Sequence, residues 1–372
     1  MRKSEVAEMK KLFAKKTTRK NFITYAFVIA AFLILQLLNS AGGLSSTMSG
    51  QLVPICVYII MALSLNLTVG ILGELSLGHA GFMSIGAFTG AITAAIIQFQ
   101  SGGNANSALC LIASVAVGAV FAAIAGVLIG IPVLRLNGDY LAIVTLAFGE
   151  IIRAIINVLY VGIDKDGLHV TFLNTDKLTL DAGGKLILNG ASGISGIVKI
   201  STFFAGFVLI ILCLIVIFNF INSRSGRAVM AIRDNRIAVD SIGIPAARYK
   251  LLAFVISATL AGMGGALFAL GQNSIVASKF DFNTSILILV FVVLGGQGNL
   301  LGSIIAATVL TVLPEMLRGF SEYRMLVYAI VLILVMVFTN NPTLKGVMQK
   351  ILPFDKIKKR FSKKADGGVK DV

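Results

Sequence analysis

Apolar residues along this chain fall into blocks of about 20, separated by short polar segments. A helix needs about 20 consecutive apolar residues to cross the hydrocarbon core of a bilayer. The pattern therefore predicts an all-α, polytopic membrane protein rather than a set of soluble domains. The predicted spans are 22–38, 52–72, 80–99, 108–131, 140–160, 202–221, 251–270, a split block made of 285–294 and 300–317, and 323–339.

The split block is the one departure from simple spans. Its first part, 285–294, has only ten residues, and Gly295, Gly296 and Gly298 follow it. Ten residues are too few to cross as a straight helix, and a broken backbone is tolerated at membrane depth only where protein or a cavity shields it. We therefore interpret the block as a broken or re-entrant pair, which brings the count to about ten membrane segments.

The charge of the chain is as unevenly distributed as its hydrophobicity. Only 13% of the residues are charged and 57% are hydrophobic, yet the net charge is +15. The excess lies in 1–20 (eight basic against two acidic residues), 345–372 (nine against three) and 222–250 (six against two). Because Lys and Arg mark the cytoplasmic side, a cytoplasmic N-terminus and ten segments place all three in the cytoplasm. We expect a basic cytoplasmic tail over 1–21, a transmembrane domain over 22–340 with a cytoplasmic loop at 222–250 and an external loop at 161–201, and a second basic tail over 341–372.

The basic segments do not predict a nucleic-acid partner. Both tails adjoin spans and lack a recognisable nucleic-acid module, so they are interpreted as topology determinants that also meet anionic lipid. The loop 222–250 differs, because apolar residues recur at about helical spacing between 228 and 242, and Gly243 with Pro245 forms a stop signal. This predicts one or two short amphipathic helices, which lie on lipid or dock in a groove of a soluble partner.

Several motifs over about 52–339 are recognisable when taken together. They are Gly226-Arg227-Ala228 through Arg233-Asp234-Asn235 to Gly243-Ile244, Gly78-His79-Ala80-Gly81-Phe82, Gly138-Asp139-Tyr140-Leu141-Ala142, and Leu294-Gly295-Gly296-Gln297-Gly298. In this combination the chain resembles the LivM-like permease subunits of bacterial branched-chain amino acid ABC importers. The resemblance implies the ABC importer permease fold, a bacterial cytoplasmic membrane, and a coupling loop that docks on an ATPase. Arg236 stands where that pattern has an acid, and Glu74 where it has a neutral residue.

The same resemblance implies a set of partners. These are a second, LivH-like permease, two LivG/LivF-like ATPase subunits, and an extracytoplasmic substrate-binding protein. ATP is expected on the ATPase chains and no cofactor on this one, because the chain has no G-x-x-x-x-G-K-[ST] motif. The residues expected to face an ATPase are Arg224, Gly226, Arg227, Arg233, Asp234, Asn235, Arg236 and Gly243.

The sequence predicts a transporter subunit rather than an enzyme. Its three cysteines lie inside apolar blocks, with no C-x-x-C and no His at metal spacing. The sequence also has no recognisable nucleophile–base pair or metal-ligand cluster, so no catalytic or metal site is predicted. A carrier of urea or a small amide by the same machinery is the alternative within transport. From another class, a stand-alone ion-coupled carrier or channel would explain the spans but not the patterned loop.

Two ionisable residues lie well inside a predicted span. Glu150 and Arg153 are three residues apart and so share a helix face, and a charge at mid-membrane costs about 2.5–3.5 kcal/mol on insertion scales. One interpretation is that the two neutralise each other and fix helix packing. The other is that they line the substrate path and meet the amino and carboxylate groups of an amino acid.

Glycine-rich interruptions provide the second candidate for the substrate path. They occur at 70–81, which contains Gly78 and His79, and at 294–302, which contains Gly295, Gly296 and Gly298. Transporters place substrate near discontinuous helices, whose ends and exposed backbone bind charged groups, and the two places suggest an inverted repeat. The alternative is that the glycines permit close helix packing. His79 itself is interpreted as a polar residue at a helix end.

Overall fold

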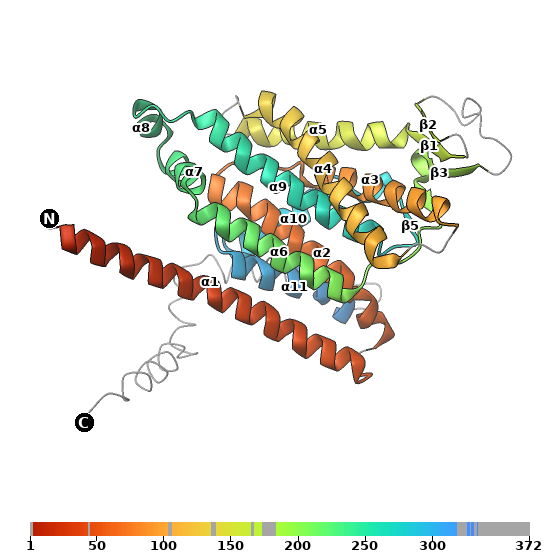
Figure 1. Ribbon diagram of the computed structural model, residues 1–372, viewed down its shortest axis with the longest axis horizontal. Coiled ribbons are helices and arrows are strands. Elements are labelled where there is room, and N and C mark those ends of the chain that lie inside the picture. Colours follow the sequence, from red (N-terminus) through yellow and green to blue (C-terminus); the bar gives the residue numbers. More distant parts are fainter. Residues whose placement is uncertain are drawn as a thin grey trace. The chain divides into compact units, whose positions relative to one another are not determined.

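The computed structural model describes residues 3–43, 45–102, 106–134, 139–164, 167–172, 184–317, 326–327, 329–330 and 333. The chain divides into two units, 1–312 and 313–372. The features described below belong to the first unit (Figure 1).

Helices make up most of the first unit. Among the described residues, eight helices are long and apolar enough to cross a membrane, and a shorter apolar one follows. They confirm the predicted all-α, multi-span fold; the last predicted span, 323–339, lies almost wholly outside the described residues. The helices are α1 (Lys3–Ser40), α2 (Ser46–Asn66, continued by the π-helix Leu67–Leu72), α3 (His79–Gln100), α4 (Ser107–Val133), α5 (Asp139–Asn157), α6 (Phe203–Asn222), α9 (Ala246–Ala269), α10 (Phe282–Gly295) and α11 (Leu300–Met316).

Two of these helices differ from the simple spans that hydropathy predicts. The expected N-terminal tail, 1–21, is for the most part helical and continuous with the first span, since α1 runs from Lys3 to Ser40. The split block forms two separate helices, α10 and α11, which are joined by the turn 296–299. The break falls where the glycines predict it, because Gly296 and Gly298 have φ of 90° and 79°, which L side chains rarely adopt.

The core lies where α9 packs between α2, α3 and α4. Glycines bring these helices together backbone to backbone: a Cβ added at Gly86 of α3 would fall on the backbone of Gly262 of α9, and one added at Gly265 on the Met83 carbonyl. Small residues at helix contacts are typical of membrane bundles, where close van der Waals packing replaces the hydrophobic effect. These four helices therefore form the closely packed centre of the bundle.

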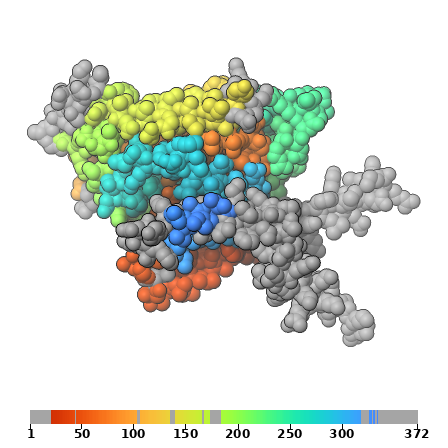
Figure 2. All heavy atoms as spheres, turned by 180° about the vertical axis from the view of Figure 1, so that it is seen from behind, coloured from red at the N-terminus to blue at the C-terminus, as the bar shows by residue number. Residues whose placement is uncertain are grey.

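The helix α5 lies at the surface of this centre. Figure 2 shows it (yellow) beside α10 (cyan), and the two helices are in contact. Its outer side is apolar and open, since Tyr140 is 70% exposed and Ile143 61%. An apolar face of this kind is suited to lipid or to another membrane helix.

The two ends of the bundle carry different structures (Figure 1). At the end we call the loop end, α7 (Arg224–Asp234) and α8 (Arg236–Ser241) follow α6. At the opposite end, the sheet end, five short antiparallel strands have the order β2-β1-β3-β4-β5, which the sequence analysis did not predict within 161–201. The strands are β1 (Tyr160–Ile163), β2 (Leu168–Thr171), β3 (Lys185–Asn189), β4 (Ile194–Ser195) and β5 (Ser274–Ile275).

The predicted amphipathic helices are present and use their apolar face within the chain. Ile232 of α7 and Val239 of α8 are buried and pack against Ala246 at the start of α9. Side-chain caps start both helices, since the Ser223 hydroxyl accepts from Gly226 N at 3.0 Å and the Asn235 amide oxygen from Ala238 N at 3.1 Å. The loop is therefore anchored to the bundle and presents its polar side outward.

Candidate functional site

The helix α3 begins inside the bundle instead of at its end. After the π-helix of α2, Gly73 turns the chain with φ 81°, and the segment 73–78 leads back to His79. The His79 side chain is fully buried between α2 and α9, where its Nε2 lies 2.8 Å from the Ser64 hydroxyl and 3.1 Å from the Ser257 hydroxyl. The first residue of α3 is thus held by polar groups of two neighbouring helices.

The two serines around His79 also bond to each other's helices. The Ser64 hydroxyl donates to the Ser257 carbonyl at 2.8 Å, and the Ser257 hydroxyl donates to the Ser64 carbonyl at 2.6 Å. The other ring nitrogen of His79, Nδ1, is buried without a partner among the described residues. Through Nε2 and the two serines, His79 ties the start of α3 to α2 and α9.

The N-terminus of α3 meets both α5 and α10. A Cβ added at Gly78, the N-cap, would fall on the Thr145 carbonyl oxygen of α5, and Leu77 N donates to the Thr145 hydroxyl at 3.1 Å. Ala80 N donates to the Ser285 hydroxyl of α10 at 3.1 Å. Gly78 is therefore required for close packing here, and the start of α3 is fixed against two other helices.

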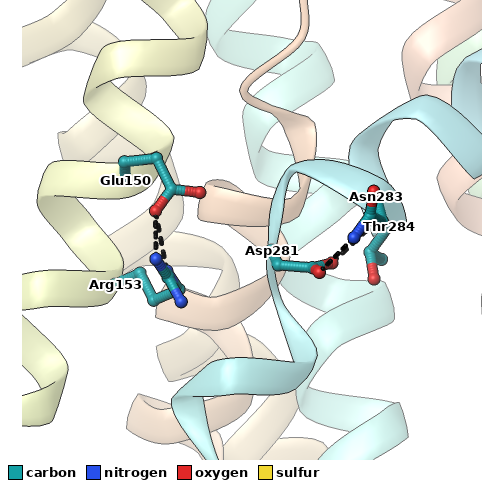
Figure 3. Close-up of polar contacts among 5 residues, drawn as sticks. All are labelled: Glu150, Arg153, Asp281, Asn283 and Thr284. Carbon is teal, nitrogen blue, oxygen red and sulfur yellow. Dashed lines mark hydrogen bonds and ion pairs between the residues drawn. The ribbon is translucent and has the colours of Figure 1, made fainter.

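The N-terminus of α10 lies at the same place. Asp281 caps it by accepting from Thr284 N at 2.9 Å, and Asn283 Nδ2 donates to its other oxygen at 2.9 Å (Figure 3). A small pocket, with a cavity volume of only about 10 Å³, lies between the starts of α3 and α10 and the middle of α5. It is lined by Leu77, Gly81, Leu146, Gly149, Glu150, Phe280, Asp281, Phe282 and Ser285.

Glu150 and Arg153 form an ion pair beside this pocket. Arg153 Nε donates to Glu150 Oε2 at 2.8 Å, and both side chains are 35% exposed. In Figure 3 both point from α5 toward the segment that carries Asp281. The pair neutralises itself, as the packing interpretation expects, yet Glu150 also lines the pocket, as the substrate interpretation expects.

The second group of glycines lies elsewhere. Gly295 and Gly298 follow the far end of α10, which spans 14 residues, so they are about 20 Å along the helix from the pocket. A Cβ added at Gly295 would fall on Ser303 N of α11, and Gly298 N donates to the Asn66 side chain at 2.8 Å. The structure therefore brings Gly78, Glu150 and Arg153 together, and it places Gly295, Gly296 and Gly298 at the junction of α10 and α11.

The residues of the predicted coupling loop divide into local and long-range contacts. Arg224 starts α7, Asn235 caps α8, and Gly243, with φ 79°, ends the turn after it. Arg227 donates to the Asn222 carbonyl at 2.7 Å, five residues away. These contacts shape the loop itself.

Two further coupling-loop residues form ion pairs within the loop, and one glycine packs closely. Arg236 pairs with Asp240 at 3.6 Å, and Arg233 with Asp234 at 3.1 Å. A Cβ added at Gly226 would fall on the Phe220 carbonyl oxygen. Arg233 also reaches the end of α2, since its Nη1 donates to the Gly70 carbonyl at 2.8 Å.

Sequence reasoning missed several polar residues of the interior. Glu74 and Lys250 form an ion pair whose side chains are only 13% and 8% exposed, and Asn66 is fully buried between α2 and α11. Ser64 and Thr68 both lie inside the predicted span 52–72. Their spacing of four places them on one helix face, and this polar stripe in an apolar block was the available signal.

Comparisons with known proteins agree with this architecture. Residues 47–336 match the family described as "Branched-chain amino acid transport system / permease component". The high-affinity branched-chain amino acid transport system permease protein LivM of Escherichia coli (strain K12) is 35% identical over 304 residues, and that of Salmonella typhimurium is 37% identical over 291 residues. Each alignment covers 76% of this chain and 66% of the relative, just under two thirds.

A more distant relative carries a different printed substrate. The fructose import permease protein FruG of Bifidobacterium longum is 26% identical over 255 residues, covering 64% of this chain and 67% of the relative. All three relatives are described as permease proteins and none as an enzyme. With a family match that extends over most of its length, the chain belongs to the permease components of branched-chain amino acid transport systems.

Proposed function

We propose that this chain is a permease subunit of an ATP-driven ABC importer that carries branched-chain amino acids across the bacterial cytoplasmic membrane. The observation that carries the proposal is the pocket between the starts of α3 and α10, together with the relatives named for branched-chain amino acid transport. The loop end, with its basic residues, faces the cytoplasm, and the sheet end faces outward toward a substrate-binding protein.

The chemistry of the pocket fits an amino acid with an aliphatic side chain. Its wall combines apolar side chains, such as Leu77 and Phe282, with the carboxylates of Glu150 and Asp281. The substrate ammonium group pairs with the carboxylates, and its carboxylate pairs with Arg153, which also pairs with Glu150. The side chain then lies against the apolar wall.

The pocket must open for transport. Its cavity volume of about 10 Å³ has room for about one water molecule and is far below the roughly 300–1,000 Å³ typical of ligand pockets, so this conformation is closed around the site. The starts of α3 and α10 are discontinuous helix ends, and such ends border substrate sites in transporters that alternate their access. Separation of α5 from these ends would enlarge the pocket.

Two surfaces of the chain are proposed to bind the other subunits of the importer. The apolar outer face of α5, which includes Tyr140 and Ile143, is proposed to meet a second permease subunit. The helices α7 and α8 are proposed to dock on an ATPase, because they present arginines beside Ile237 and Ile242, which are 83% and 72% exposed. Replacement of Ile237 by Asp should reduce capture of the ATPase subunits, whereas Val198→Asp at the sheet end should not. Equal capture by both variants would contradict the docking surface.

The substrate assignment is tested by ATP-dependent uptake of labelled leucine into proteoliposomes containing the complete importer. Glu150→Gln should lower uptake at sub-saturating leucine by about 10- to 100-fold, because a charge-assisted hydrogen bond is lost. The control Glu315→Gln removes a carboxylate of α11 that does not line the pocket and should leave uptake unchanged. Isoleucine and valine should compete, whereas urea and fructose should not. Wild-type uptake by the Glu150→Gln variant would remove this residue from the substrate site.

A further inference from the structure

We propose that Arg233 is a positioning residue that transmits movement of the loop helices α7 and α8 to the substrate pocket, an inference that rests on the proposed function. The side chain crosses from α7 to the end of α2, where Nη1 donates to the Gly70 carbonyl at 2.8 Å. Its aliphatic stem lies against Gly73, where an added Cβ would contact the Arg233 side chain. Arg233 thus holds the end of α2 by both a hydrogen bond and packing.

The π-helix explains why a carbonyl is available at Gly70. The amides of Gly73 and Glu74 both donate to the Thr68 carbonyl, and the helix ends there. The last four carbonyls of a helix have no donor from a following turn, and a carbonyl left unpaired in a membrane protein costs several kcal/mol. Arg233 supplies a charged donor to one of these carbonyls, so α7 acts as the cap of α2.

A second clamp joins the end of α2 to the turn between α10 and α11. The backbones of Gly70 and Gly298 touch, since a Cβ added at Gly70 would fall on Gly298 N. Asn66 is fully buried one turn earlier: its oxygen accepts from Gly298 N at 2.8 Å, and its nitrogen donates to the Ser303 hydroxyl at 2.7 Å. A shift of the end of α2 therefore carries the α10–α11 turn with it.

Both elements held at this point lead to the pocket. From Gly73 the chain passes Glu74, which is paired with Lys250, and reaches Leu77 and the start of α3. From the α10–α11 turn, the single helix α10 runs back to Phe282 and Ser285 on the opposite pocket wall. Arg233 therefore acts on two walls of the pocket through two short, well-packed routes.

Arg227 provides a control that distinguishes the positioning role of Arg233 from a general contribution to ATPase docking. Arg227 lies on the same helix, but its guanidinium donates to the Asn222 carbonyl, five residues away, and not to α2. Arg233→Gln and Arg227→Gln remove the same charge and hydrogen-bonding group from α7. Only the first breaks the connection to Gly70, and Arg233→Lys keeps a charged donor at that position.

The test measures leucine uptake and ATP hydrolysis in the same reconstituted importer. For Arg233→Gln, the ATPase subunits should stay bound and hydrolysis should stay within about twofold, while leucine transported per ATP falls at least about tenfold, because a charge-assisted hydrogen bond is lost. Arg233→Lys should recover most of this ratio. Arg227→Gln removes an arginine of the docking surface but not the bond to Gly70, so any loss should appear as weaker ATPase capture, and leucine transported per ATP by the assembled importer should keep the wild-type value. Ser303→Ala, which removes the partner of Asn66 without touching the loop, should lower the ratio in the same direction.

The possible failures are distinguishable. An unchanged ratio in Arg233→Gln, an equal loss in Arg227→Gln, or loss of bound ATPase in Arg233→Gln would each overturn the positioning role. Absence of ATP-dependent leucine uptake in the wild-type importer would instead overturn the proposed function, before any variant is compared.

Discussion

The ion pair between Glu74 and Lys250 should dominate the stability of the segment that leads into α3. Both side chains are nearly buried, at 13% and 8% exposure. Two opposite unit charges about 3 Å apart attract by about 5 kcal/mol at an effective dielectric constant of about 20, and this attraction offsets the cost of removing both from water. Loss of one partner leaves the other charge buried and uncompensated, which typically costs about 3–5 kcal/mol.

We therefore expect Lys250→Met to lower the free energy of unfolding by about 3–5 kcal/mol. Glu74→Gln should be destabilising in the same direction. The double variant should lie within about 1 kcal/mol of the wild type, because replacement of a whole buried pair is often neutral. Detergent-solubilised protein, unfolded by SDS titration and followed by circular dichroism, provides the measurement. Comparison of the two single variants with the double variant isolates the interaction energy of the pair, because the two residues contact each other directly.

The exposed pair Arg236–Asp240 is the control for this cycle. Its atoms are 3.6 Å apart and its side chains are 42% and 49% exposed, so Asp240→Asn should change stability by no more than about 1 kcal/mol. The reasoning is refuted if Lys250→Met costs no more than this control. It is also refuted if the two single losses simply add in the double variant, because that would mean the buried charges do not interact.

Two further substitutions test packing and polar contacts around the start of α3 by the same unfolding titration. Gly78→Ala should be destabilising, because its Cβ would fall on the Thr145 carbonyl and prevent α3 from packing against α5. The control Gly50→Ala, where nothing lies within 4 Å, should be neutral or slightly stabilising. Equal stability of the two variants would contradict the close contact. Ser64→Ala should cost about 1–3 kcal/mol, because His79 loses the shorter of its two hydroxyl contacts and the Ser257 carbonyl loses a donor. Ser76→Ala removes an equally buried hydroxyl that has no partner among the described residues, so a cost as large as that of Ser64→Ala would show that burial alone accounts for the effect.

Hydropathy predicts the spans well because it registers a property of each segment alone. The helices up to α11 follow the predicted blocks, and even the break after 285–294 follows from Gly296 and Gly298, whose positive φ requires glycine. The five-stranded sheet was not predicted, because its strands are two to five residues long and pair across distant parts of the chain: β4 with β5 joins Ile194 to Ile275. Such pairing leaves no periodic signal in either segment.

The candidate site was predictable only in part, for a related reason. Glu150 and Arg153 are conspicuous because charges are rare inside spans, and the structure places Glu150 at the pocket. Asp281 was overlooked because it lies at a block edge, where a helix cap is the ordinary interpretation, and it does cap α10. Its position beside Glu150 depends on how α5 and α10 pack, which the sequence of neither helix contains.

The positions of the buried polar residues follow a rule that can be applied to a sequence alone. Where a membrane helix is interrupted, its free backbone groups must find partners inside the protein. Asn66 and Thr68 lie at the change from α-helix to π-helix, and Asn66 and Arg233 supply donors or acceptors to the backbones of Gly298 and Gly70. In an apolar block, a polar residue within a few positions of a glycine therefore predicts two things: a break in the helix, and a side chain that can bond to the backbone groups freed by the break. By this rule the segment 64–81 marks an interrupted helix more strongly than its glycines alone do.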